Sequence, residues 1–187
     1  MTESRILYFE TGGKEHTDAT LKIARERAEA LGIRQLVVAS SHGFTAKRAK
    51  AVFAGTDIEI IAVTICGGYA DQGWTMTTEE RADLEALGIR VLTTIHALGD
   101  DVSDAMEHHA PNRIVRETLY RFCQGMKVAV EVAIMAADAD MLDMEREIIA
   151  VAGTGEGADT ALVLKPAYAR KFRELEIREI LTKPRSA

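Results

Sequence analysis

Short apolar runs alternate along the chain with segments in which apolar residues recur every three or four positions. The runs are rich in β-branched residues and are bounded by polar or glycine clusters, as strands buried in a parallel sheet are. The spacing of three and four is typical of amphipathic helices and occurs in 21–31 and 46–53. The resulting order β, α, β, α, β predicts an α/β fold. The expected strands are 36–39, 58–65, 91–95, 128–137, 148–152 and 161–164.

Two kinds of local signal mark helix ends. Thr77 and Glu80 have the spacing of a capping box, in which each side chain accepts a hydrogen bond from the backbone amide of the other residue. The sequence Leu-Gly-Ile-Arg occurs twice, at 31–34 and 87–90. In each copy we expect the glycine to end a helix in the left-handed conformation and the isoleucine to cover its last turn. The repeat therefore predicts the same helix-to-strand joint twice.

Two segments are harder to interpret from their pattern. Residues 100–124 are more polar and contain Pro111, which predicts a helical hairpin broken into two pieces. Residues 168–181 combine helix-like charge spacing with a late apolar cluster. Helix and edge strand both stay open for that segment.

Composition favours a single domain over residues 1–187. Because 47% of the 187 residues are apolar, one core can bury about 70% of the surface that the unfolded chain exposes. The net charge of −6 and the isoelectric point near 5.4 provide no basic field. Since binding to nucleic acid or to an anionic membrane depends on Lys and Arg displacing counterions, we expect neither as a partner.

Cysteine usage and the first residues indicate a location in the cytoplasm. Cys66 and Cys123 lie far apart, outside any CxxC pair and away from histidines at zinc-ligand spacing. We therefore expect no metal and a reducing compartment. Residues 1–5 are polar and lead into a short strand-like segment, without the features of a signal peptide or a long apolar span. Secretion and membrane insertion are disfavoured.

A small polar loop follows the first expected strand and leads directly into a helix. Ser40, Ser41 and Thr45 offer hydroxyl groups. Gly43 lets a ligand approach the backbone, and His42 precedes it. Ligands of open α/β sheets collect beyond the carboxyl ends of strands, where helix N-termini attract anions. The loop therefore predicts a phosphate site, and the alternative is an ordinary helix cap.

A second glycine-rich loop follows the expected strand 148–152. It superficially resembles a dinucleotide-binding loop, but such a loop opens a helix, whereas 161–164 has the pattern of a strand. We therefore expect a wide turn, whose amides either face a ligand or merely connect two strands. Its candidate binding residues are Gly153, Thr154, Gly157, Ala158, Asp159 and Thr160.

The sequence also resembles a known family. Residues 36–65 contain Val-Val-Ala-Ser-Ser-His-Gly-Phe-Thr-Ala and then Ile-Ile-Ala-Val-Thr, and they resemble the C-terminal domain of pyruvate kinase, whose corresponding loop holds a phosphate of an allosteric sugar bisphosphate. The whole chain is similar to the stand-alone proteins described as pyruvate kinase alpha/beta domain proteins. That resemblance is carried by Tyr8-Phe9, Gly13-Lys14-Glu15-His16-Thr17, Ile134-Met135-Ala136-Ala137-Asp138 and Gly157-Ala158-Asp159-Thr160-Ala161.

The resemblance implies a three-layer α/β/α sandwich with a mostly parallel mixed sheet and an antiparallel edge. The strands before Ser40 and Gly153 would be neighbours, so that both loops line one crevice. Pyruvate kinase activity is not implied, because in that enzyme it belongs to a separate barrel domain. The pyruvate kinase loop usually carries Arg at Phe44, and the stand-alone family usually carries Asn at His16, which argues against a sugar bisphosphate. Members of the stand-alone family resemble flavin-phosphate binders, so FMN is the implied cofactor.

Several other side chains are candidates for ligand contact. Tyr69 and Trp74, in the glycine-rich stretch 66–76, could close over a planar ring or simply pack. Lys14 could reach the charge of a ligand or remain solvated. Glu131 interrupts the expected strand 128–137, where it is either a paired site acid or a solvent-facing edge residue. Asp138, at the end of that run, caps a turn or faces the crevice.

Three functions are compatible with this pattern. The first is a binding or sensing module that holds a phosphorylated small molecule, with FMN as the candidate. The second is a flavin-dependent enzyme in which Glu131, Asp138 or Cys66 acts on a second molecule. The third is a structural subunit that associates with other copies, as a homo-oligomer, through its apolar helix faces.

Overall fold

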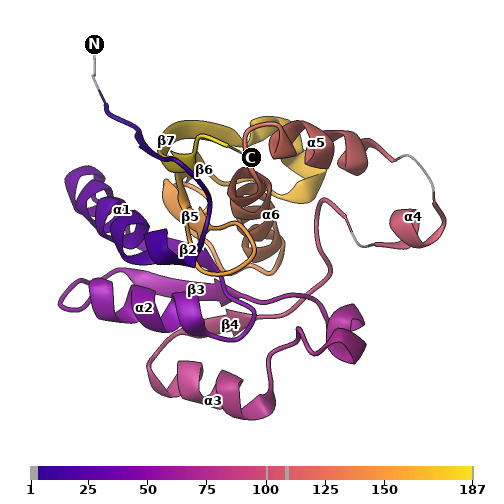
Figure 1. Cartoon of the computed structure of the whole chain (residues 1–187), viewed down its shortest axis with the longest axis horizontal. Helices are drawn as coiled ribbons and strands as arrows, with labels where there is room; N and C mark the ends of the chain where they lie inside the picture. Colours follow the sequence, from indigo (N-terminus) through magenta and orange to yellow (C-terminus); the bar gives the residue numbers. More distant parts are fainter. Residues whose placement is uncertain (1–3, 100, 108–109, 187) are drawn as a thin grey trace.

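A seven-stranded mixed sheet forms the centre of the protein. The computed structural model describes residues 4–99, 101–107 and 110–186. The strand order is β1-β7-β6-β5-β2-β3-β4 (Figure 1). β6 is antiparallel to β5 and β7, and the other neighbouring pairs are parallel. The strands are β1 (Leu7–Phe9), β2 (Gln35–Ala39), β3 (Glu59–Val63), β4 (Arg90–Leu92), β5 (Ile148–Ala152), β6 (Thr160–Lys165) and β7 (Glu176–Pro184).

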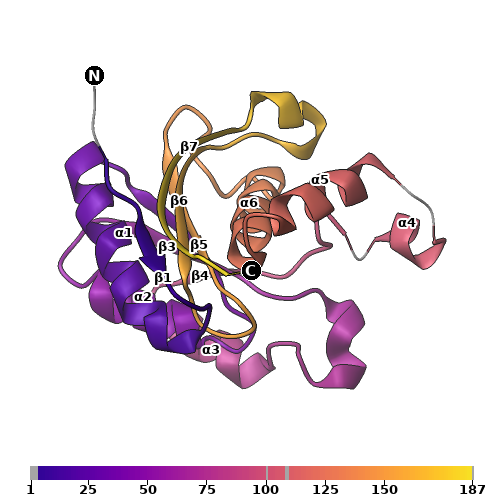
Figure 2. The same ribbon diagram turned by 45° about the horizontal axis from the view of Figure 1, so that its top comes forward.

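Helices cover both faces of the sheet, which confirms the expected mostly parallel, three-layer α/β/α arrangement with its antiparallel pairings on one side. Figure 2 shows α1 and α6 on opposite sides of the strands. The α-helices are α1 (Thr17–Leu31), α2 (Phe44–Val52), α3 (Thr78–Ala86), α4 (Val102–Ala105), α5 (Pro111–Tyr120) and α6 (Gln124–Asp138), and the short 3-10 helices are η1 (Lys14–His16), η2 (Gly67–Gln72) and η3 (Ala169–Glu174).

The two layers of core follow from the alternation of side chains along the central strands. Leu36 and Val38 of β2 belong to the cluster that also contains α1, α2 and Leu84 of α3. Val37, between them, belongs to the cluster built around α6. Because these side chains are all fully buried, a shift of β2 by one residue would exchange its two faces. The burial of both faces therefore fixes the register of the central strands.

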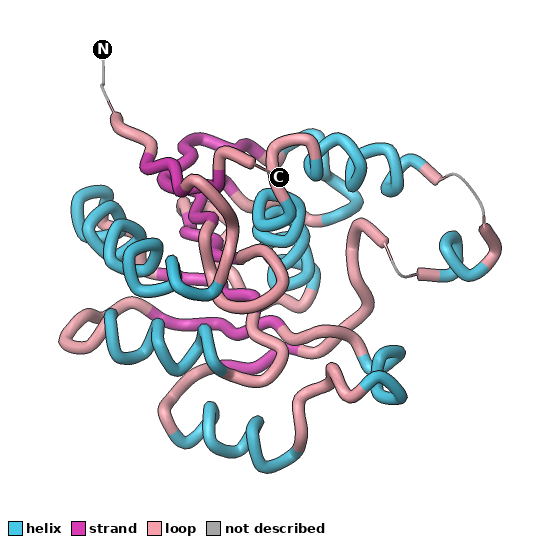
Figure 3. Tube along the Cα trace, viewed as in Figure 1, coloured by secondary structure: helices cyan, strands magenta, loops and turns pink. Residues whose placement is uncertain are grey.

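The expected strand at 128–137 is wrong, because these residues lie in the helix α6 (Figure 3). In α6 every residue from Ala129 to Ala137 is buried. A helix that is enclosed on nearly all sides carries apolar residues around most of its surface, so the helical spacing is kept only by a few polar residues, Gln124, Lys127, Glu131 and Asp138. Its alternating Val and Ile residues then have the pattern of a buried strand.

The uncertain segments resolve into short elements. Pro111 does not break a helix but begins α5, where its missing N–H costs nothing. The expected two pieces are α4 and α5, and neither has a buried residue. Residues 100, 108 and 109 of this segment lie outside the described residues. The second open segment forms η3 followed by β7.

The expected helix ends are confirmed. Thr77 and Glu80 form both hydrogen bonds of a capping box at the start of α3. Gly32 and Gly88, from the two Leu-Gly-Ile-Arg copies, have φ values of 67° and 75°. In this left-handed region glycine avoids the steric cost of a Cβ atom. Each copy therefore ends a helix just before a strand, β2 in the first case and β4 in the second.

Candidate functional site

A pocket of about 440 Å³ opens at the carboxyl ends of β2, β3 and β5. β2 and β5 are parallel neighbours, as the resemblance to the pyruvate kinase domain implies, so the loops that follow them meet at one edge of the sheet. The helix α2 begins in the first loop. The N-terminus of α6 lies beside the second, since Gly155 N donates to Gln124 Oε1 at 3.3 Å. Two helix N-termini therefore approach the same pocket, which favours an anion.

The loop after β2 brings four predicted residues to the pocket: Ser40, Ser41, His42 and Thr45. Ser40 Oγ accepts a hydrogen bond from Ala46 N at 3.3 Å, so its hydroxyl caps α2 while it borders the pocket. The first two residues of α2 are Phe44 and Thr45. Within the described part of the chain, their backbone amides have no hydrogen-bond acceptor. The loop thus combines uncapped amides with hydroxyl groups.

Gly43 shapes this loop and does not line the pocket. Its φ of 84° is left-handed, and a Cβ atom at this position would lie 3.3 Å from Leu84 Cδ2. Gly43 therefore lets the chain turn into α2 while packing against α3. The structure thus shows a turn that favours glycine at this position, and the approach of a ligand to the Gly43 backbone stays a prediction.

The loop between β5 and β6 forms another wall of the pocket and is the wide turn expected from the sequence. Gly153, Gly155, Glu156 and Gly157 line the pocket. A Cβ atom on Gly153 would lie 2.7 Å from the carbonyl oxygen of Gly157. The loop is therefore folded too tightly for a side chain at Gly153.

The remaining candidates of this loop hold it in place and do not line the pocket. Asp159 is fully buried. Its Oδ2 accepts from Gly13 N at 3.1 Å and from Thr154 N at 2.9 Å, and its Oδ1 accepts from Thr160 Oγ1 at 2.7 Å. Ala158 N donates a hydrogen bond of 2.9 Å to the hydroxyl group of Thr17, the first residue of α1. These residues tie the turn to the loop after β1.

Lys14 connects three elements at the mouth of the pocket. Its Nζ lies 2.8 Å from Glu156 Oε2 and 4.3 Å from the centre of the Phe44 ring. The hydrogen bond from Lys14 lowers the pKa of Glu156. In the loop between β2 and α2, His42 Nδ1 lies 3.1 Å from Oε2 of Glu80 in α3. The pKa of Glu80 is also lowered, first by the amide of Thr77 and then by His42.

The pocket contains a buried ion pair that the sequence analysis found only in part. Glu131 lines the pocket, as predicted, but from α6 and not from a strand. Its partner is Lys127, one helical turn earlier, with 2.5 Å between Nζ and Oε2. Glu131 Oε1 accepts from Leu98 N at 2.9 Å. The signal that could have revealed Lys127 is its spacing of four residues from Glu131, which brings side chains together only in a helix.

Asp138 does not reach the pocket. It ends α6, at the opposite end from Gln124, and its carboxylate accepts from Ala169 N at 3.2 Å. Of the two alternatives for this residue, the structure thus favours the cap of a neighbouring turn. The misassigned strand at 128–137 was the reason for expecting it at the crevice.

Aromatic rings border another part of the pocket. Tyr69 stacks on Trp74 with 5.4 Å between the ring centres, and on His96 with 6.2 Å. These three rings line the pocket together with Tyr120, and Trp74 remains about half exposed, at 51%. Cys66 is half-buried and does not border the pocket.

The first turn of α6 packs so closely on the β5–β6 loop that adding a methyl group should destabilise the protein. A Cβ atom on Gly125 would lie 2.2 Å from Thr160 Oγ1 and 2.9 Å from Asp159 Oδ1. Gly→Ala normally stabilises a helix by about 1 kcal/mol. Here we expect Gly125→Ala to lower the free energy of unfolding by about 1–3 kcal/mol, because of overpacking.

Urea unfolding of Gly125→Ala and of Gly67→Ala would measure this difference. Gly67 is the control, since its added Cβ would meet no atom within 4 Å. A stability of Gly125→Ala equal to or above that of the wild type would contradict the close packing of α6 on this loop.

Comparisons with known proteins give distant structural similarity. No family model matches the chain. A pyruvate kinase from Cryptosporidium parvum is similar with a TM-score of 0.37 and 14% identity, over 72% of this chain and 20% of that one. A second structure, Cryptosporidium parvum pyruvate kinase in complex with ADP, is similar with a TM-score of 0.38 and 15% identity, over 79% of this chain and 22% of that one. The chain thus spans about a fifth of the pyruvate kinases it matches. The fold assignment rests on the sheet topology of the chain itself.

None of the helices in 4–99, 101–107 and 110–186 has both the length and the hydropathy needed to cross a membrane. In the same ranges, no group of three or more His, Cys, Asp or Glu residues is placed to hold a metal ion.

Proposed function

We propose that this chain is a binding module whose pocket holds a phosphorylated small molecule, with the phosphate at the loop of residues 40–45. The observation that carries the proposal is the start of α2, where two amides without an acceptor in the described structure meet the hydroxyl groups of Ser41 and Thr45 at the pocket. A helix N-terminus stabilises an anion by about 0.3–1 kcal/mol, and each hydrogen bond to a charged group adds about 1.5–3 kcal/mol.

FMN is our candidate ligand. A volume of about 440 Å³ lies in the range of small-molecule and cofactor sites, about 300–1,000 Å³. The stacked rings of Tyr69 and Trp74 offer an aromatic surface for a planar ring. The resemblance to the stand-alone alpha/beta domain proteins supports a flavin phosphate. Purified protein that is yellow and releases a chromophore on denaturation would agree with this choice of ligand.

A charge reversal at the loop tests the phosphate site. We expect inorganic phosphate to raise the melting temperature of the wild type, because a ligand that binds only the folded state stabilises it. Ser41→Asp places a negative charge at the loop, and we expect it to weaken phosphate binding at least about tenfold. The readout is the shift in melting temperature over a phosphate titration.

The matched control is Ser186→Asp, which adds the same charge at an exposed serine near the C-terminus. We expect its response to phosphate to equal that of the wild type. Equal responses of Ser41→Asp and Ser186→Asp, or no response of the wild type, would rule out a phosphate at this loop. A response to phosphate without any response to FMN would retain the site and reject the flavin.

A further inference from the structure

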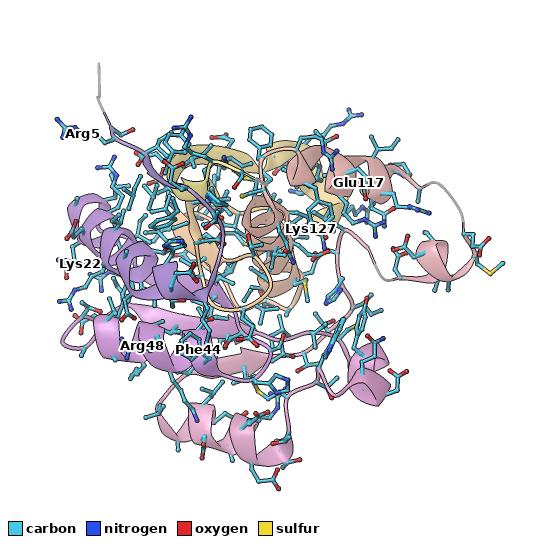
Figure 4. All side chains as sticks on the ribbon, viewed as in Figure 1. Arg5, Lys22, Phe44, Arg48, Glu117 and Lys127 are labelled. Atoms are coloured by element: carbon cyan, nitrogen blue, oxygen red, sulfur yellow. The ribbon has the colours of Figure 1, made fainter. Side chains whose placement is uncertain are left out.

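Lys127 is a buried amine at the wall of the pocket that phosphate binding does not use. Its side chain is 6% exposed, and that of Glu131 is 4% exposed. Figure 4 labels Lys127 on α6 and Phe44 at the start of α2, and both residues line the pocket. Apolar side chains of α6, Val128, Val132 and Met135, line the pocket around it. Desolvation of this kind makes a lysine available as a nucleophile.

Glu131 lies directly against the amine of Lys127. Its Oε2 accepts from Lys127 Nζ at 2.5 Å, and its Oε1 accepts from Leu98 N at 2.9 Å. The carboxylate is therefore placed to take a proton from Nζ, which a lysine has to lose before its lone pair can attack a carbonyl carbon.

We propose that Lys127 forms an imine with the carbonyl group of an aldehyde phosphate held in this pocket, with Glu131 as the proton carrier. The proposal rests on the phosphate site proposed above, which would anchor the ligand while its aldehyde reaches α6; such a ligand takes the place of FMN, which has no aldehyde group. It adds a covalent site and a substrate class, namely small aldehydes that carry a phosphate.

The reaction is a condensation without oxidation or reduction. The lone pair of Lys127 Nζ attacks the carbonyl carbon, and the carbonyl oxygen takes the proton of the Glu131 carboxylic acid, which gives a carbinolamine. Glu131 then accepts a proton from Nζ and returns it to the hydroxyl group, which leaves as water while the C=N bond forms. The product is a protonated imine beside the Glu131 carboxylate, and the net reaction is ammonium plus aldehyde to protonated imine plus water.

The other lysine at the pocket is a poorer candidate. Among the lysines in the described residues, Lys14 and Lys127 line the pocket. The side chain of Lys14 is 48% exposed and pairs with Glu156, whose side chain is 76% exposed. Because water stabilises the ammonium form of such a residue, Lys14 has no comparable reason to act as a nucleophile. Lys14 therefore serves as the internal comparison.

The test uses pyridoxal phosphate as the probe, because it carries an aldehyde and a phosphate on a planar ring. The folded full-length protein is incubated with the probe, the imine is reduced with sodium borohydride, and the modified lysine is identified by peptide mass spectrometry. We expect one adduct per chain, on Lys127. We also expect excess inorganic phosphate to slow its formation, and pyridoxal, which lacks the phosphate, to react at least about tenfold more slowly.

Three variants complete the design. Lys171→Arg, at an exposed lysine that pairs with Glu174 and does not line the pocket, should label like the wild type. Glu131→Gln keeps an acceptor for Leu98 N but carries no proton, so its adduct on Lys127 should form about a hundredfold more slowly. Lys127→Met/Glu131→Gln removes both charges together and should form no adduct, with circular dichroism used to show that it is folded.

The outcomes separate the two proposals. The imine site is overturned, and the phosphate site is left intact, if the adducts form on Lys14 or are scattered over surface lysines. The same conclusion follows if the protein stays unmodified although phosphate stabilises it. An adduct on Lys127 that forms equally fast with pyridoxal, and that phosphate does not slow, would support a reactive Lys127 and overturn its anchoring by phosphate.

Discussion

Lys127→Met is expected to lower the free energy of unfolding by about 3–5 kcal/mol. The substitution leaves Glu131 buried without the cation that neutralises it, in a helix whose residues from Ala129 to Ala137 are all buried. Removing one partner of a buried ion pair lowers the free energy of unfolding more than removing both partners, because a single charge then remains in surroundings of low polarity. The measurement is urea unfolding at neutral pH.

The double variant Lys127→Met/Glu131→Gln is the control for this prediction. Its neutral amide can still accept the hydrogen bond from Leu98 N, so most of the lost stability should return. If Lys127→Met alone is as stable as the wild type, the ion pair is solvated in solution and the buried arrangement is incorrect. If both variants lose the same free energy, packing and not charge accounts for the effect.

Asp159→Ala should have the second large effect, with a loss of about 3–5 kcal/mol. Three donors end on this carboxylate, from Gly13, Thr154 and Thr160. Hydrogen bonds to charged groups contribute about 1.5–3 kcal/mol each, and a buried donor left without a partner costs a similar amount. Because Asp159 holds the β5–β6 loop, we also expect Asp159→Ala to respond less than the wild type to inorganic phosphate.

Asp83→Ala provides the matched comparison, since Asp83 pairs with Lys47 at an exposed position. Such pairs contribute about 0–1 kcal/mol. Thermal and urea unfolding of the two alanine variants, followed by a phosphate titration of each, would measure both effects. An Asp159→Ala variant no less stable than Asp83→Ala would show that the carboxylate does not anchor the loop.

The sequence predicted the part of the fold in which each element has a distinct local signature. The strands next to the pocket have short β-branched runs with polar residues at both ends, and the structure places β5 at 148–152, as expected. Capping and turn signals were also reliable, because the bonds in a capping box and the left-handed glycines depend on neighbouring residues alone.

The helix α6 was mistaken for a strand because its apolar residues cover most of its surface, and the few polar residues that keep the helical spacing, at 124, 127, 131 and 138, were not recognised as one face. Two consequences for the candidate site followed. Asp138, for which the crevice was one of two alternatives, lies at the far end of the helix and caps a turn instead. Lys127 was overlooked, because its pairing with Glu131 exists only when four residues make about one turn.

The described part of the segment between β4 and α6 borders the pocket but buries little of its own surface. Its helices α4 and α5 contribute no buried residue, and segments with little buried surface open at lower free energy than a sheet core. His96 and Tyr120, near its two ends, border the pocket. If the proposed phosphate site is correct, we expect the rates of ligand entry and release to respond to substitutions in α4 and α5, and the strength of phosphate binding to respond to substitutions in the loops that follow β2 and β5. The two properties could then change independently.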